Sequence, residues 1–367
     1  MLSRETQSSD ASTKTIDLDI VDPISALIFR FTGTNGTTSN LNNFISDIIT
    51  KIEIVDGSEV LYSLTLAELE ALQFYKTGKP PAMFPSEWAS GSQRHEAMML
   101  FGRRLWDQDY ALDARKFKNP QLKITWNLAA IRAVSATLGF ATGTLGISVV
   151  AKIMENMAVA PSKYLMAKEL LNFTSSATSG AEERKELDTD KIYRMLMTRH
   201  WVQLSDINEI TSDLKLTADS DKYIAFNRKL ADMDAEALQL FGASRLKHDM
   251  RIADNTQTRL LHNKEPDVRA AWTTQNLFDI WGIAYQWSSE IKSWLGSHAG
   301  AADATAREMT AVEEGHALHA TLPIPFGDMD KPETWFDPTG LKKLELVFTS
   351  GGTAGSCAVV AEQVRPL

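Results

Sequence analysis

The hydrophobic pattern between residues 44 and 78 changes its period once, from two residues to about 3.6. Apolar and polar residues alternate over 48–54 and again over 60–64, and Asp56-Gly57 lies between the two runs. Asp-Gly tolerates the positive φ that a tight hairpin turn requires. From Leu66 to Tyr75 the apolar residues recur with helical spacing, and a glycine ends the pattern. The stretch therefore predicts a strand, a hairpin turn, a second strand and a short helix.

The same pattern occurs a second time, between residues 207 and 242. Ile45 aligns with Ile207, and the strand, turn and helix patterns follow in the same order. The helical part of each copy contains Glu-Ala-Leu-Gln, at 70–73 and at 236–239.

A second match lies further along each half. Both halves contain Phe-Gly, then a tryptophan, then an alternating strand: Phe101-Gly102, Trp106 and 119–126 in the first half, and Phe326-Gly327, Trp335 and 341–348 in the second. Two matches in the same order indicate two copies of one β-rich domain. We then expect the two helices to superpose with Ala71 on Ala237 and Leu72 on Leu238, each leucine facing its own domain core.

Between these matches the chain divides into segments of different composition. The first residues are polar and rich in Ser and Thr, 157–171 has a helical pattern, and the segment that begins at Thr174 is rich in Ser, Thr and Gly. The predicted organisation is a flexible tail at 1–14, a first domain at 15–173, a linker at 174–190 and a second domain at 191–367. The segments 79–119 and 272–315 are expected to be long excursions from the two domains.

Composition and charge are typical of a soluble globular protein. The 367 residues are enough for two domains with real cores, and 44% of them are hydrophobic. A net charge of -9 and the lack of a polybasic run argue against nucleic acid as a main partner. No apolar run suggests a signal peptide, and the Gly- and Ser-rich stretch 133–151 favours buried strands over a membrane span. The single cysteine, Cys357, excludes an intrachain disulfide, and we expect it reduced and packed on a terminal strand.

The nearest approach to a metal cluster is His316 and His319, which follow Glu313-Glu314. The segment leads into a strand, where residues three apart point to opposite faces. A packing or exposed role is therefore favoured over a metal site. The chain contains no G-x-S-x-G, P-loop or H-E-x-x-H motif.

Three other features suggest chemistry less strongly than structure. Asp107, Asp109 and Asp113 could form an acid/base set, but the arginines among them favour a charged loop or a subunit contact. The Gly-rich stretch 350–356 lies between two strand patterns and is expected to be a hairpin loop. The 9 tryptophans could line a sugar-binding groove, but core and interface anchors are favoured. We expect no catalytic, cofactor-binding or metal-binding residues, and no cofactor.

Taken together, these segments resemble the double jelly-roll major capsid proteins of tailless, often membrane-containing viruses of prokaryotes. The resemblance rests on the segment 52–60 and the helix that follows it, on the segment 75–80 at the end of that helix, and on the last strand segments 322–327 and 344–364. It covers most of the chain. It implies a mainly β fold of two tandem eight-stranded jelly-roll β-sandwich domains with short helices and long loops.

The resemblance also implies a function. The protein would be a structural major capsid protein, not an enzyme, and would form homotrimeric, pseudo-hexagonal capsomers in the icosahedral virion of a virus such as a bacteriophage. The implied partners are further copies of itself, neighbouring capsomers, and penton and minor capsid proteins, and the N-terminal tail is a candidate contact with an internal membrane. We also expect the protein to assemble in the host cytoplasm and not to bind nucleic acid sequence-specifically.

Two functions of other classes stay open. One is a tandem β-sandwich carbohydrate-binding protein or viral spike, against which the lack of a signal peptide counts modestly. The other is a glycoside hydrolase on a jelly-roll scaffold, using carboxylates such as Asp107 and Asp109.

Overall fold

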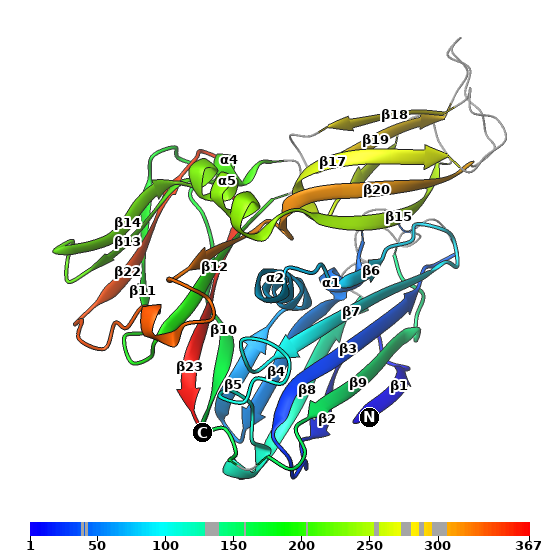
Figure 1. Cartoon of the computed structure of the whole chain (residues 1–367). Helices are drawn as coiled ribbons and strands as arrows, with labels where there is room; N and C mark the ends of the chain where they lie inside the picture. Colours follow the sequence, from blue (N-terminus) through cyan, green and yellow to red (C-terminus); the bar gives the residue numbers. More distant parts are fainter. Residues whose placement is uncertain are drawn as a thin grey trace.

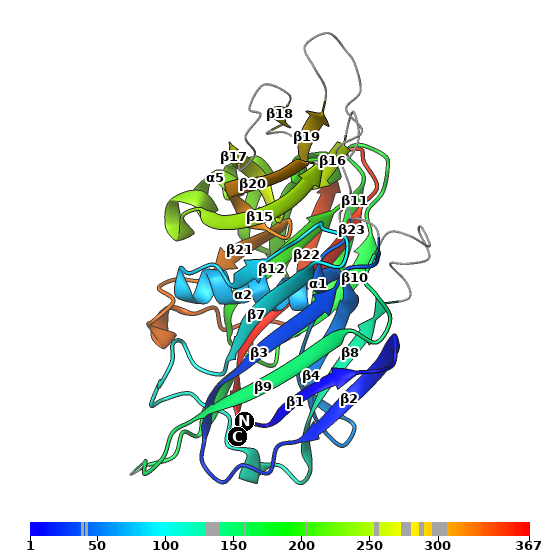
Figure 2. The same ribbon diagram turned by 90° about the vertical axis from the view of Figure 1, so that its right-hand side faces the viewer.

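The computed structural model describes residues 1–37, 40, 43–128, 139–157, 159–202, 205–252, 257–272, 280–285, 290–295 and 307–367. Figure 1 shows a lower part made of two β-sandwiches and an upper part that lies at the opposite end from both termini. Figure 2 gives the same arrangement from the side, again with the two termini together at the lower end.

The first half of the chain forms two sheets that we call the first sandwich. One sheet has the order β1 (Ser3–Gln7), β9 (Leu145–Ile153), β3 (Ile24–Thr34), β7 (Ser92–Leu100) and β6 (Ala82–Phe84). The other has the order β2 (Ala11–Asp17), β8 (Pro120–Asn127), β4 (Ile49–Asp56) and β5 (Glu59–Leu64). Alternation sets which face is buried: Leu122, Ile124 and Trp126 of β8 lie in the core, and the residues between them are half-buried.

The second sandwich repeats this order, except that β6 has no counterpart among its strands. One group is β10 (Lys163–Thr174), β23 (Ser356–Pro366), β12 (Tyr193–Trp201) and β21 (Thr321–Pro325). The other is β11 (Glu182–Leu187), β22 (Leu344–Ser350), β13 (Thr211–Ala218) and β14 (Tyr223–Lys229). The strands β5 and β10 lie side by side in parallel, with Ser63 opposite Lys168, so the two sandwiches share one 8-stranded sheet.

The upper part, which we call the projection, inserts between α5 and β21 of the second sandwich. One of its sheets has the order β15 (Ser244–Ile252), β20 (Arg307–Leu318) and β17 (Asn263–Trp272). The other has the order β16 (Gln257–Leu260), β19 (Glu290–Leu295) and β18 (Ile280–Tyr285). The short helices are α1 (Ile45–Ile48), α2 (Leu66–Thr77), α4 (Ile207–Ile210) and α5 (Leu230–Phe241), and 3-10 turns occur at Ala114–Lys116 and Pro332–Thr334.

The predicted hairpin and helix form as the sequence indicates. Gly57 has a φ of 61° in the turn between β4 and β5. Thr65 and Glu68 cap the start of α2 reciprocally, side chain to backbone, and Gly78 ends the helix in the left-handed conformation. The local pattern was sufficient here because turn, cap and terminator all agree.

The duplication extends to the irregularities of the strands. β4 is bulged against β5 after Ile54, and β13 is bulged against β14 after Leu216, which is the aligned position. The strand pairs β3–β9 and β12–β23 also have bulges at matching positions, after Ile24 in β3 and after Tyr193 in β12. Bulges at matched sites are a signature of common architecture that strand count alone does not provide.

The residue alignment of the two helices was wrong by two positions. Ile52 pairs with Leu64 in the first hairpin, and its aligned residue Leu214 pairs with Arg228 in the second. Leu64 therefore aligns with Arg228. The helices start together at Leu66 and Leu230, and Ala71 does not lie on Ala237. The shared Glu-Ala-Leu-Gln letters fall on different helix faces. As a result Leu72 is 1% exposed, whereas Leu238 is only half-buried.

Several segments also differ from expectation. Residues 3–7 and 11–14, predicted as a flexible tail, belong to β1 and β2, which pair with β9 and β8. The predicted linker contains β11, which pairs with β22. Residues 163–171, predicted as helix, belong to β10, because pairing with β23 overrides the Leu, Met, Lys and Glu content of this segment. By this pairing β10 lies with the second sandwich, although it was assigned to the first domain.

The remaining expectations concern the excursions and the uncharged stretch. The segment 79–119 contains β6 and β7, and 272–315 contributes β18, β19 and β20. Of the stretch 133–151, residues 145–151 belong to β9, and 133–138 lie outside the described residues. Within the described ranges, no helix combines the length and apolar character needed to cross a membrane.

Candidate functional site: an internal junction and its open counterpart

The helix α2 is the element on which the two sandwiches meet. Tyr75 donates a hydrogen bond to the carbonyl of Thr321 in β21, at 2.6 Å, and its ring centroid lies 5.1 Å from that of Phe241 in α5. From the other side, Tyr164 of β10 donates to the carbonyl of Leu61 in β5, at 3.2 Å. Buried hydroxyls with backbone partners fix the relative position of the sandwiches more narrowly than apolar contact alone would.

A buried ion triad lies at the same junction. The ammonium of Lys76, at the end of α2, and the guanidinium of Arg194, in β12, both contact the carboxylate of Glu362 in β23, with Arg194 Nη1 2.5 Å from Oε2. All three side chains are at most 2% exposed. Burial lowers the pKa of Lys76 to about 8, although Glu362 opposes the shift. The same burial would raise the pKa of Glu362, but the two cations hold it below its ordinary value.

The helix α5 occupies the position of α2 in the second sandwich but lacks its cover. Of 12 residues in each helix, α2 buries nine and α5 buries four. Leu240 corresponds to Lys76, because Gly242 corresponds to Gly78, and it is 59% exposed. A groove of about 440 Å³ runs between α5, β14 and β21, and its apolar lining includes Phe226, Met233 and Pro325.

Two strand edges are open in the described chain, one beside α5 and one at the outer edge of the first sandwich (Figure 1). In the four-stranded sheet, β14 pairs only with β13, and Tyr223 and Ile224 are 50% and 48% exposed. In the first sandwich, β1 pairs only with β9. β14 is the counterpart of β5, and β1 is the counterpart of β10, which are the two strands that meet inside the chain. Unpaired edges are surfaces that commonly recruit another chain.

Solved structures with this arrangement cover almost the whole chain. The major capsid protein of STIV matches with a TM-score of 0.60 and 12% identity, over 98% of this chain and 95% of that one. A chain of the Sulfolobus turreted icosahedral virus structure matches with a TM-score of 0.61 and 13% identity, over 99% and 89%. The major capsid protein P2 of bacteriophage PM2 matches with a TM-score of 0.52 and 11% identity, over 100% and 98%. The fold is a double jelly roll.

The sequence itself gives no such match. No protein-family model and no curated protein matches it. At identities near 12%, the likeness establishes the double jelly roll and leaves function to be argued from the surfaces.

The candidate acid/base residues of this double jelly roll are engaged by arginines. Arg103 contacts Asp107 at 2.8 Å and Asp109 at 2.5 Å, and Arg115 contacts Asp113 at 3.0 Å. Burial would raise the pKa of Asp107, but the hydrogen bonds from Arg103 hold it below its ordinary value. A carboxylate held ionised in this way serves a structural loop better than proton transfer.

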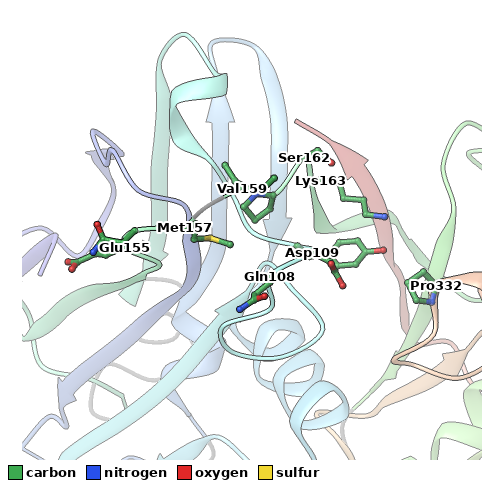
Figure 3. A pocket seen from close by; sticks show the side chains of 12 residues that line it. Gln108, Asp109, Glu155, Met157, Val159, Ser162, Lys163 and Pro332 are labelled. Carbon is green, nitrogen blue, oxygen red and sulfur yellow. The ribbon is translucent and has the colours of Figure 1, made fainter.

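A cavity of about 690 Å³ lies beside this loop. Figure 3 shows the loop residues Gln108 and Asp109 opposite the segment that carries Val159 and Lys163, with Pro332 of the second sandwich on the far side. The Lys163 ammonium lies 4.7 Å from the centroid of the Tyr110 ring. Two of the three charged residues that line the cavity are therefore already engaged, Asp109 by Arg103 and Lys163 by an aromatic ring.

The two histidines of the suggested metal cluster point to different carboxylates. His316 Nε2 lies 2.9 Å from Asp234 in α5, and His319 Nε2 lies 2.6 Å from Glu70 in α2. In the parts of the chain that the structure describes, no three or more His, Cys, Asp or Glu side chains are arranged so that they could hold a metal ion.

Glu70 was missed because its partners lie far away in the sequence. It is 0% exposed and also contacts Nδ1 of His95, at 2.8 Å. The available signal was a charged residue inside an otherwise apolar helix face, which requires a buried partner.

The other candidates have packing roles. The stretch 350–356 was expected to be a hairpin loop, but it connects β22 to β23, which lie in different sheets and do not pair with each other. A Cβ on Gly351 in this loop would lie 2.2 Å from the backbone oxygen of Asn208. Cys357 is buried in β23, and burial raises the pKa of its thiol. Trp335 is 6% exposed, with its ring centroid 5.9 Å from that of Tyr110 across the junction. The Trp-rich side chains of 272–295 lie outside the description.

Proposed function

We propose that the protein is the major capsid protein of an icosahedral virus and that it assembles as a homotrimer. The observation that carries the proposal is the open counterpart of the internal junction: α5 and β14 repeat α2 and β5 without a cover, and β1 repeats β10 without a partner. The likeness to major capsid proteins of STIV and bacteriophage PM2 supports the functional class.

Matching surfaces define how the subunits would join. Inside one chain, α2 and β5 of the first sandwich contact β10 and β23 of the second. The equivalent contact between chains brings α5 and β14 of one subunit against β1 and β9 of the next. Each subunit has one surface of each kind, so the contact is head-to-tail, and it forms a closed ring when the rotation between subunits closes. A ring of six similar sandwiches contains three chains and fits a hexagonal lattice position.

The contact between subunits differs chemically from the internal one. Leu240 takes the position of Lys76. The matching bulges in the β12–β23 and β3–β9 pairs place Lys152 at the position of Glu362 and Ser25 at the position of Arg194. The buried ion triad therefore has no counterpart between subunits. An apolar contact around Leu240 and the groove beside it would hold them, which accounts for large apolar side chains exposed in the isolated subunit.

In this proposal the protein is structural rather than enzymatic. It is located in the virion and assembles in the host cytoplasm. Its further partners are neighbouring capsomers and penton and minor capsid proteins. An internal membrane contact through a flexible tail is no longer included, because residues 3–7 and 11–14 are strand. The carbohydrate-binding and hydrolase alternatives are not favoured by any described residue.

Light scattering behind a sizing column tests the proposed contact. We expect the wild-type protein to be a trimer and Leu240→Asp to be a monomer, because the substitution places a charge in the apolar contact. Val21→Asp is the matched control: Val21 is 68% exposed and lies outside both surfaces, so this variant should stay trimeric. A wild-type monomer, or a Leu240→Asp trimer as stable as the control, would contradict the proposal.

A further inference from the structure

A cluster of buried histidines lies where the projection meets the first sandwich. The first sandwich contributes Glu70 of α2, His95 of β7 and Phe44 before α1, and the projection contributes His248 of β15, His262 between β16 and β17, Glu313 of β20 and His319 after β20. Except for half-buried Phe44, each of these side chains is at most 7% exposed. We call this group the histidine cluster.

Three of its histidines have a carboxylate partner. His95 and His319 contact the two oxygens of Glu70, at 2.8 and 2.6 Å. His248 Nε2 lies 2.5 Å from Glu313 Oε2. Each of these imidazoles therefore has a buried carboxylate as its hydrogen-bond partner.

His262 is the exception. It is 3% exposed, and neither ring nitrogen has a hydrogen-bond partner among the described residues. Its ring stacks on Phe44, with the centroids 4.0 Å apart, and the centroids of His95, His248 and His319 lie 5.6, 5.6 and 5.0 Å away. Burial, together with these three neighbours, holds the pKa of His262 well below its ordinary value.

Carboxylates near His262 do not neutralise a proton on its ring. Glu313 accepts hydrogen bonds from the backbone N–H groups of His262 and Asn263, and Glu70 is occupied by two other histidines. Two more charged groups lie at the edge of the cluster: the carboxylate of Asp47, which caps α1, and Arg199, which donates to the carbonyl of His319 at 3.2 Å. A proton on His262 would thus be buried without an acceptor.

Besides the histidine cluster, Leu246 of β15 and Leu318 of β20 attach the projection to the first sandwich, because both belong to its hydrophobic core. In the described residues the attachment also includes a short backbone contact, in which Glu87 N–H donates to the Asp249 carbonyl at 3.1 Å and Asp249 N–H donates to Pro85 at 3.3 Å. Most residues of that hydrophobic core come from the first sandwich itself, so local detachment of the projection can occur without global unfolding.

We propose that the histidine cluster is a pH-sensitive latch, in which protonation of His262 at mildly acid pH releases the projection from the first sandwich. This proposal stands independently of the capsid assignment. The His262 imidazole stays neutral while the projection is docked, but it is protonated below about pH 6.5, its ordinary pKa, once the projection is released. The equilibrium constant for docking therefore falls by up to tenfold for each pH unit below about 6.5. Glu70 affects docking at lower pH, because its pKa falls from 4.5 to about 2 in the folded protein. The stabilisation that its negative charge provides is lost only below about pH 4.5. The test therefore uses the window between about pH 6.5 and 4.5, which lies above the range in which the contribution of Glu70 is lost.

Hydrogen–deuterium exchange of the full-length protein tests the latch, with rates corrected for the intrinsic effect of pH. We expect exchange in β15 and β20 to rise by up to tenfold per pH unit as the pH falls through the window, while β3 and β9 stay protected. His262→Phe should remove this dependence. The substitution keeps the contact with Phe44 and breaks no side-chain hydrogen bond, and His262→Leu provides a second apolar variant.

His200→Gln is the matched control. His200 is also buried, and burial lowers its pKa to about 3, but it lies in β12 against Thr211 and Thr198. This variant should keep the acid-dependent exchange of β15 and β20. The latch would be refuted by unchanged wild-type exchange across the window, by equal loss of protection in all strands, or by the same pH dependence in the folded His262→Phe and His262→Leu variants.

Discussion

Replacing the central carboxylate of the buried ion triad should have a different effect from replacing one of its cations. Glu362→Gln removes the carboxylate that both buried cations contact, and breaking a buried pair in this way costs about 3–5 kcal/mol. Lys76→Met removes one cation and leaves Glu362 paired with Arg194. The fall of the Lys76 pKa from 10.5 to about 8 corresponds to about 3 kcal/mol against the charged form at neutral pH. We therefore expect Lys76→Met to be neutral or stabilising.

Urea unfolding followed by tryptophan fluorescence measures both effects. The pH dependence provides an internal check, because a lysine whose pKa is lowered on folding costs stability fully below about pH 8, and this cost fades as the pH rises toward 10.5. The advantage of Lys76→Met over the wild type should therefore shrink between those values. Equal destabilisation by Lys76→Met and Glu362→Gln would refute the reasoning, since it would mean that attraction exceeds the cost of burying the lysine.

Three further predictions concern packing and charge. Leu72→Asp should cost about 3 kcal/mol or more in a urea titration because it buries an unpaired charge, and Leu238→Asp should cost clearly less; similar losses would contradict the corrected helix alignment. Gly351→Ala should lower the melting temperature by several degrees because its Cβ meets the backbone of α4, whereas Gly340→Ala, with open space around it, should not; equal melting temperatures would argue against this contact. Burial, with Glu68 nearby, raises the pKa of Glu169 to about 8, so stability should fall as the pH rises toward and through 8, and Glu169→Gln should remove that loss; an unchanged pH profile would show that this carboxyl titrates normally.

The sequence was informative where local signals agreed. Asp56-Gly57, the Thr65 cap and Gly78 each specify one backbone conformation, so the hairpin and helix could be predicted without tertiary contacts. The order of these elements also revealed the duplication. The residue alignment slipped because four matching letters were given more weight than strand register, which only pairing with a neighbour determines.

Features that depend on distant partners could not be predicted. β10 has a helix-like composition and becomes a strand because β23, almost two hundred residues later, pairs with it. Residues 3–7 are too polar to suggest a strand, yet β9 supplies their hydrogen-bond partners. The histidine cluster combines residues from 44 to 319, and only the charge of Glu70 on an apolar helix face indicated that a buried partner existed.

The central claim is that the open surface of the second sandwich receives the first sandwich of another copy. Cryo-electron microscopy of the purified oligomer tests this most directly. The account predicts three chains of 40.7 kDa around a threefold axis, six β-sandwich lobes in a ring, and β14 of each chain beside β1 of the next. A reconstruction in which α5 and β14 face solvent, whatever the number of chains, would contradict it.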